Sequence, residues 1–235
     1  MKVALAQISP VFLDRESTLK KIVRIIEENA DAALIAFGEA LVPGYPFWVE
    51  RTGGAEFAAS IQEKWHAAYQ REAVAIEQGD LALVCEAARD TRTCVYVGVM
   101  ERPGDRGGHS LYASLVFVDN DGAIKSVHRK LMPTYEERLV WATGDGHGLR
   151  THAVGAFTVG GLNCWENWMP LARASLYAQG GGGGNLGQRW QLHCGTRRQL
   201  ARGTNHRRGN GYHRRTRQRC HSRCAPQLRS KRPLR

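Results

Sequence analysis

The sequence lacks the features that would place it in a membrane or outside the cell. It contains no uninterrupted run of about 18 apolar residues, the length that a membrane-spanning helix needs. Close to the first residue, Gln7, Ser9 and Pro10 interrupt the apolar residues before a signal-peptide core could form. The six cysteines are scattered along the chain, so they do not indicate a disulfide framework. We therefore expect a cytoplasmic protein with reduced thiols.

Acidic residues are absent from the last part of the chain. Residues 181–235 contain 14 Arg and one Lys but no Asp or Glu, whereas residues 1–180 contain 18 basic and 22 acidic residues. The net charge of +11 thus hides a difference between −4 for the first region and +15 for the second. Because the larger region is mildly acidic, a uniformly basic nucleic-acid-binding domain is disfavoured.

The same last region, residues 181–235, also lacks Ile, Val, Phe and Met. A segment of this composition cannot bury enough apolar surface to offset about 1–2 kcal/mol of backbone entropy per ordered residue. We therefore predict a folded domain over residues 1–180 and an Arg- and Gly-rich tail without regular structure over residues 181–235.

Apolar runs and helical periodicity alternate along residues 1–180. Leu19, Ile22, Val23 and Ile26 recur at the spacing of one helix face. Similar reasoning predicts helices at residues 55–76, 81–89 and 170–178, and strands at 3–8, 32–37, 93–99, 111–118, 123–127 and 157–162. The turn 120–122 predicts a hairpin. This order of elements predicts a layered α/β fold with mixed sheets.

Three chemically distinctive residues, Glu39, Lys130 and Cys164, each follow an apolar strand. In layered α/β folds, side chains at strand ends converge on a pocket. A thiol attacks as a thiolate, which an adjacent ammonium favours and which a carboxylate can generate by accepting the proton. Taken alone, each residue also fits a structural role, as a buried thiol or a solvated charge, and spacing does not decide between these readings.

The segments that surround Glu39, Lys130 and Cys164 indicate the function more specifically than these three residues alone. The three segments read Phe-Gly-Glu-Ala-Leu-Val-Pro-Gly-Tyr-Pro-Phe-Trp (37–48), His-Arg-Lys-Leu-Met-Pro-Thr (128–134) and Gly-Leu-Asn-Cys-Trp-Glu-Asn (161–167). In order and spacing they closely resemble the three motifs of the nitrilase, or carbon-nitrogen hydrolase, superfamily. The resemblance covers residues 1–180 and is greater to nitrilases than to amidases or carbamoylases. It implies an α-β-β-α sandwich with mixed sheets, incomplete on its C-terminal side.

The resemblance also implies roles for individual residues. Glu39 would be the general base, Lys130 the stabilising cation and Cys164 the nucleophile. Glu137, in the segment after the second motif, would be a second pocket carboxylate.

Two aromatic residues, Tyr45 and Trp165, would bind substrate by the same resemblance. The backbone N–H of Trp165 is a candidate oxyanion donor, although this residue also fits a packing role at the strand-to-helix turn. Tyr135 departs from the family, in which many nitrilases have His at this point. No cofactor or metal is implied.

By this resemblance, we expect hydrolysis of a small organic nitrile to a carboxylic acid and ammonia through a cysteine thioimidate and thioester. A cyanide-hydrating relative and an aliphatic amidase are neighbouring alternatives. An inactive nitrilase fragment whose basic tail binds polyanions is a third. The family also implies a homo-oligomer. Composition and the absence of a long apolar run lead us to expect no membrane partner and to disfavour a nucleic-acid partner.

Three accounts of the tail remain open. It could bind phosphates through its paired arginines, or hold a metal through side chains of irregular spacing, namely His193, Cys194, His206, His213, Cys220, His221 and Cys224. Alternatively, it could be translated in the wrong frame. Shifting the frame by one nucleotide allows residues 188–200 to read Asn-Gly-Gly-Ser-Phe-Ile-Val-Ala-Pro-Asp-Gly-Ser, which resembles a later nitrilase hairpin. That third account also requires a deletion near the glycines at 180–184.

Overall fold

The structure is a computed structural model that describes residues 1–107, 109–180 and 189–194. Its first sheet has five strands in chain order: β1 (Val3–Ala6), β2 (Leu34–Phe37), β3 (Cys94–Glu101), β4 (Tyr112–Val118) and β5 (Ile124–Arg129). The first three strands are parallel, and β4 and β5 continue the sheet as an antiparallel hairpin. The sheet is therefore mixed, as predicted.

A second sheet packs against the first. It contains β6 (Thr151–Val154), β7 (Phe157–Asn163) and β8 (Arg189–Cys194), with β7 in the middle. The strand β6 is antiparallel to β7, whereas β8 is parallel to it. A buried apolar cluster fills the space between the two sheets and includes Tyr96, Phe117 and Val159.

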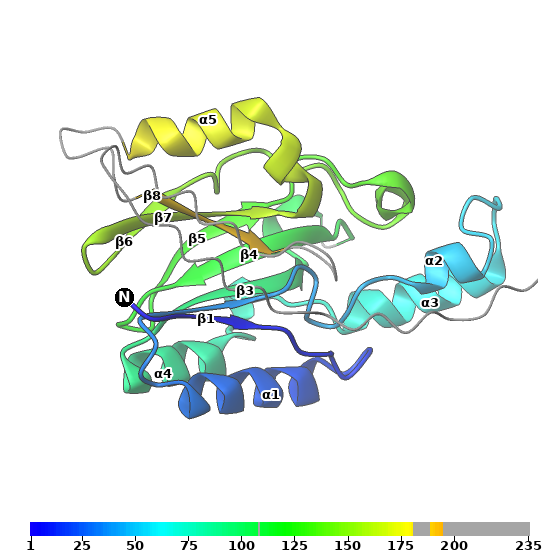
Figure 1. Ribbon diagram of the computed structural model, residues 1–235. Coiled ribbons are helices and arrows are strands. Elements are labelled where there is room, and N and C mark those ends of the chain that lie inside the picture. Colours follow the sequence, from blue (N-terminus) through cyan, green and yellow to red (C-terminus); the bar gives the residue numbers. More distant parts are fainter. Residues whose placement is uncertain (108, 181–188, 195–235) are drawn as a thin grey trace, which may run out of the picture. The chain divides into compact units, whose positions relative to one another are not determined.

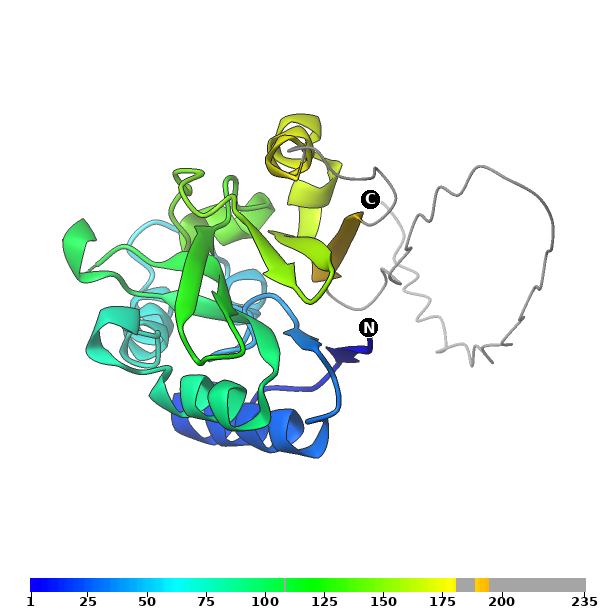
Figure 2. The same cartoon turned by 90° about the vertical axis from the view of Figure 1, so that its left-hand side faces the viewer.

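Helices cover the outer faces of both sheets (Figure 1). Two of them, α1 (Arg15–Glu28) and α4 (Ala82–Thr91), lie against the five-stranded sheet over the largest core cluster. On the other side, α5 (Pro170–Gln179) packs Leu176 onto β7, and Figure 2 shows this helix beyond the second sheet. The layers run α-β-β-α, so the predicted fold class is confirmed.

The connections carry the shorter helices. They comprise α2 (Trp48–Arg51), α3 (Ser60–Arg71) and four 3₁₀ turns: η1 (Ile76–Gln78), η2 (Gly104–Arg106), η3 (Tyr135–Leu139) and η4 (Cys164–Trp168). Among the described residues, no helix is long and apolar enough to cross a membrane.

The helix predicted over residues 55–76 is wrong at both ends. Ala58 has a φ of +53°, outside the helical region, and α3 begins only at Ser60. After Arg71 the chain becomes extended, because the N–H of Val74 donates to Met100 O at 2.6 Å and pairs with the end of β3. A sheet contact, which local periodicity does not reveal, ends the helix.

The structure also differs from the prediction at two strands. The short strand β6 was not predicted, and its side chains show little of the continuous burial seen in β2 or β3. The tail was expected to lack regular structure, yet residues 189–194 form β8. Without β8, one backbone edge of β7 would have no strand partner among the described residues, and composition alone does not reveal this demand. The tail residues named for phosphate or metal binding lie, from residue 195 onwards, outside the described residues.

Candidate active site

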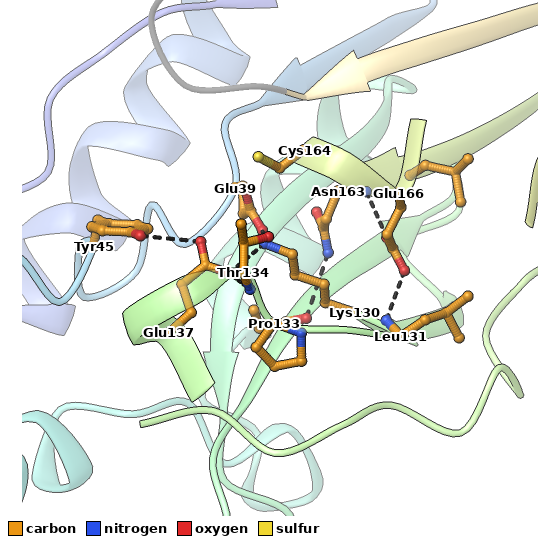
Figure 3. A network of polar contacts seen from close by, with 12 residues as sticks. Glu39, Tyr45, Lys130, Leu131, Pro133, Thr134, Glu137, Asn163, Cys164 and Glu166 are labelled. Atoms are coloured by element: carbon orange, nitrogen blue, oxygen red, sulfur yellow. Dashed lines mark hydrogen bonds and ion pairs between the residues drawn. The ribbon is translucent and has the colours of Figure 1, made fainter. Parts of the chain in front are cut away.

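The ends of three strands bring the predicted catalytic residues together (Figure 3). Glu39 follows β2, Lys130 follows β5, and Cys164 follows β7. The strands β2 and β5 point in the same direction within the first sheet, so their C-terminal ends lie at the same edge. The second sheet packs over the first and places the end of β7 above them.

Lys130 lies between two carboxylates at this edge. Its Nζ is 2.8 Å from Oε1 of Glu39 and 2.6 Å from Oε2 of Glu137. All three side chains are almost completely removed from solvent. We call Glu39, Lys130 and Glu137 the charged cluster. Because one cation faces two potential anions, the cluster is built to hold a proton or a further positive charge.

Burial controls the protonation of the charged cluster. It raises the pKa of Glu39 to about 7, although the Lys130 ammonium acts in the opposite direction. Burial alone would lower the pKa of Lys130, but the carboxylates of Glu39 and Glu137 outweigh it, so this pKa lies above its usual value. Near neutral pH, Glu39 is therefore poised to gain or lose a proton while Lys130 stays charged.

Glu137 is held by its own turn and by Tyr45. Within η3, its Oε2 accepts a hydrogen bond from the backbone N–H of Thr134 at 2.6 Å. Its Oε1 accepts a hydrogen bond from the hydroxyl of Tyr45 at 3.1 Å. The structure therefore brings two further predicted residues to the site: Glu137 contacts Lys130, and Tyr45 contacts Glu137.

Cys164 begins η4 with an unusual backbone conformation. Its φ is +44°, in the left-handed region that residues other than glycine and asparagine rarely adopt. Burial, followed by the negative charge of Glu39, raises the pKa of the thiol to about 11, whereas Lys130 and the backbone N–H of Trp165 act in the opposite direction. At neutral pH the sulfur therefore carries its proton.

Trp165 follows Cys164 with its indole 56% exposed, and it contacts Trp168 at a ring-centroid distance of 6.2 Å. The indole does not fill the core at this turn. Its backbone N–H favours the charged form of the Cys164 thiol, because it lowers the pKa of that thiol. Its assignment as a substrate-binding residue and oxyanion donor remains a prediction.

A glycine below Glu39 allows the backbone to approach closely. A Cβ atom at Gly98 of β3 would lie 2.2 Å from the carbonyl oxygen of Gly38 and 2.7 Å from Cα of Glu39. Both contacts are with backbone, which cannot rotate away as a side chain could. Because Gly98 has no side chain, the backbone of Gly38 and Glu39, just after β2, can pack directly on β3.

Sequence reasoning did not assign a role to Glu166 and His128. Glu166 is 1% exposed, and its carboxylate accepts hydrogen bonds from two different parts of the chain. The signal available in the sequence was the spacing from Asn163 to Glu166, which is typical of a capping box, and this box is present. The partners from β5 were not visible in that spacing.

Two surface depressions lie away from these residues. They have volumes of about 350 and 370 Å³ and are lined by residues of α2, α3 and η3, among them Trp48, His66 and Leu139. Neither is lined by Glu39, Lys130 or Cys164. Within the described residues, no three His, Cys, Asp or Glu side chains are grouped so as to hold a metal ion.

The fold and the strand-end residues define a four-layered α-β-β-α protein with a buried Glu-Lys-Glu cluster next to a cysteine. Residues 2–182 match the family model of carbon-nitrogen hydrolases. The chain therefore belongs to the carbon-nitrogen hydrolase family.

Proteins named as nitrilases are among those of similar sequence. The chain is 36% identical over 178 residues to "Nitrilase 2" from an unknown prokaryotic organism, covering 74% of this chain and 54% of that protein. It is also 36% identical over 180 residues to an aliphatic nitrilase of Rhodococcus rhodochrous, covering 76% of this chain and 45% of the relative. The chain thus spans about half the length of the curated relatives it matches.

Solved structures share the fold at lower sequence identity. An amidase from Nesterenkonia sp. superposes with a TM-score of 0.57 at 17% identity, covering 83% of this chain and 64% of the amidase. A carbon-nitrogen hydrolase from Helicobacter pylori gives 0.57 at 15% identity, covering 83% and 60%.

Proposed function

We propose that this protein is a nitrilase that hydrolyses a small organic nitrile to a carboxylic acid and ammonia. The observation that carries the proposal is the position of Lys130, whose Nζ lies within 2.8 Å of Glu39 and 2.6 Å of Glu137 beside the Cys164 turn. The names of the relatives, which are nitrilases at 36% identity, support the choice of a nitrile over an amide.

Proton transfer from Cys164 to Glu39 begins the reaction. With thiol and carboxyl pKa values of about 11 and about 7, a free thiolate is a minor species at neutral pH. Glu39 therefore removes the proton as the sulfur attacks the nitrile carbon, and does not form a thiolate beforehand. The nitrile nitrogen then takes up a proton from the Glu39 carboxyl, and the product of this step is a thioimidate.

Lys130 and Glu137 act in the attack and in the steps after it. During the attack, the buried Lys130 ammonium stabilises the negative charge that develops on the nitrile nitrogen. A first water adds to the thioimidate carbon, and ammonia leaves with protons supplied through the charged cluster. A second water then hydrolyses the thioester and returns the Cys164 thiol. Two waters are consumed for each carboxylic acid and ammonia released.

Ammonia release tests the proposal. Simple aliphatic and aromatic nitriles are compared with the corresponding amides and with cyanide, using the full chain and two cysteine variants. Cys164→Ala should abolish nitrile hydrolysis, whereas the matched control Cys85→Ala, at a half-buried thiol in α4, should retain it. Cys164→Ser should also fail, because a hydroxyl is far less acidic than a thiol.

The substrate comparison separates the alternatives. Release from amides alone would make the protein an amidase, and conversion of cyanide alone would make it a cyanide-hydrating relative. Hydrolysis by Cys164→Ala at the parent rate would remove this residue from the mechanism. Absence of release from every substrate would contradict the proposal for this chain and favour the inactive fragment, whose binding to a polyanion such as heparin would then be measured.

A further inference from the structure

Glu166 connects the two parts of the candidate active site. Its Oε1 accepts a hydrogen bond from the backbone N–H of Leu131 at 2.7 Å, and its Oε2 accepts one from the backbone N–H of Asn163 at 2.8 Å. Nε2 of His128 lies 3.0 Å from both oxygens. Figure 3 shows the carboxylate between these two segments.

The partners of Glu166 lie next to the reacting groups. His128 and Leu131 stand two residues before and one residue after Lys130, at the end of β5. Asn163 immediately precedes Cys164, at the end of β7. A single carboxylate therefore ties the segment that carries the cation to the segment that carries the nucleophile.

A helix-capping role explains only part of this arrangement. Capping η4 requires the local contact between Glu166 and the N–H of Asn163, three residues earlier. It does not require the contacts to Leu131 and His128, which are 35 and 38 residues away in sequence. Burying a carboxylate is costly unless its oxygens are hydrogen-bonded, and here donors from both sheets satisfy it.

We propose that Glu166 is a positioning residue that holds the end of β5, with Lys130, against the turn that carries Cys164. This inference rests on the proposed function, because it gives Glu166 a part in that reaction. The carboxylate itself does not touch the substrate. It binds the backbone of Leu131 and of Asn163, and in this way fixes the distance between the Lys130 ammonium and the Cys164 sulfur.

The charge of Glu166 has a second effect on the site. The charged and titratable groups that face Glu39 are Lys130, Glu137, Cys164 and Glu166, together with the phenols of Tyr45 and Tyr69. Burial is the main cause of the raised pKa of Glu39, and the negative charge of Glu166 contributes in the same direction. His128 faces Glu166 from β5. Loss of this charge should therefore lower the pKa of Glu39.

Two substitutions separate spacing from charge. Glu166→Asp keeps the negative charge but shortens the side chain by one methylene, so it cannot reach both backbone donors. Glu166→Gln keeps the length but removes the charge and turns an NH₂ group toward a donor. The control is Glu136→Gln, which makes the same chemical change at an exposed residue of η3.

The measurement is the rate at which iodoacetamide alkylates Cys164, followed by peptide mass spectrometry between pH 5 and 10. Alkylation does not require turnover, because the sulfur displaces iodide and its proton passes to Glu39 or to solvent. In the parent chain the rate should rise with pH as Glu39 ionises, near pH 7. Cys85 and Cys94 report general thiol reactivity in the same samples.

Both variants should lower the alkylation rate of Cys164 roughly ten- to a hundredfold at the upper end of this rise, because the base and the sulfur are misaligned. Only Glu166→Gln should also move the rise to lower pH, since Glu39 then ionises more easily. Glu166→Asp should leave the midpoint in place, and Glu136→Gln should change neither quantity.

Circular dichroism and thermal unfolding are measured for each variant. Parent-like rates and midpoints in both Glu166 variants would overturn the proposal. So would loss of the fold in both, because Glu166 would then be a structural residue only. If Glu166→Gln alone unfolds, the Glu166→Asp rate decides. Failure of the proposed function would be seen separately, as a parent chain that releases no ammonia while Cys164 alkylation still follows the expected pattern.

Discussion

The charged cluster and the cysteine turn, residues 163–168, are held in place by different means. Glu39, Lys130 and Glu137 are enclosed by the core and joined by ion pairs of 2.6–2.8 Å. The cysteine turn has a strained residue at its start, and the indoles of Trp165 and Trp168 are 56% and 66% exposed. The site thus combines a rigid electrostatic half with a nucleophile on a thinly covered turn.

The two parts of the site also differ in the elements that enclose them. The residues that enclose the charged cluster come from the first sheet and its connections, all within residues 1–180. The cysteine turn follows the central strand of a sheet that contains three described strands. Substitutions in the charged cluster should therefore cost far more stability than substitutions on the outer side of the turn.

Lys130→Ala should have the largest effect. It leaves two buried carboxylates facing each other without a cation, which typically costs about 3–5 kcal/mol. The control is Lys125→Ala. The Lys125 side chain is 52% exposed and its Nζ lies 3.1 Å from Asp119 Oδ2, so we expect its loss to lower the free energy of unfolding by less than about 1 kcal/mol. Urea unfolding of both variants provides the comparison. Equal losses would show that the charged cluster is not stabilised as described.

Comparing the parent with Glu39→Gln should reveal how the buried Glu39 carboxyl makes the free energy of unfolding depend on pH. The folded-state pKa of about 7 lies above the usual value of 4.5, so the parent protein binds an extra proton when folded between these values. Its free energy of unfolding, relative to that of Glu39→Gln, should fall by roughly 3 kcal/mol as the pH rises from 4.5 to 7.

Unfolding titrations of the parent and Glu39→Gln at several pH values measure this difference. The variant should also lose activity about a hundred- to ten-thousandfold, as expected for removal of a general base. A difference in unfolding free energy that stays constant across this pH range would contradict the raised pKa.

Trp168→Ser should have the smallest effect. Its indole is 66% exposed, so little apolar surface returns to water when it is removed. We expect the free energy of unfolding to change by no more than about 0.5 kcal/mol. A loss comparable to that of Lys130→Ala would mean that the outer side of the cysteine turn is covered in solution, for instance by another copy of the chain.

The motifs around Glu39, Lys130 and Cys164, and not the strand ends alone, predicted this part of the site. The structure brings the three residues together at the ends of β2, β5 and β7. The mixed character of the sheet and the hairpin of β4 and β5 followed from the order of elements and the turn at residues 120–122.

Contacts between distant segments could not be predicted in this way. The hydrogen bonds of Glu166 join residues 35 and 38 positions apart, and neither end contains a signal for the other. The end of α3 depends on the bridge between Val74 and Glu101, and β8 depends on its parallel pairing with β7. In each case a tertiary partner overrides what the local composition favours.

The close approach at Gly98 has a consequence for attempts to alter the substrate range of the protein. Glu39 rests on the backbone of β3 through atoms that every variant shares, so substitutions that reshape the surrounding pocket leave the base where it is. Position 98 is the exception, because even a methyl group there meets Gly38 O and the Glu39 backbone. A library that diversifies the pocket should therefore keep this codon fixed, together with the codons of the charged cluster, Cys164 and Glu166.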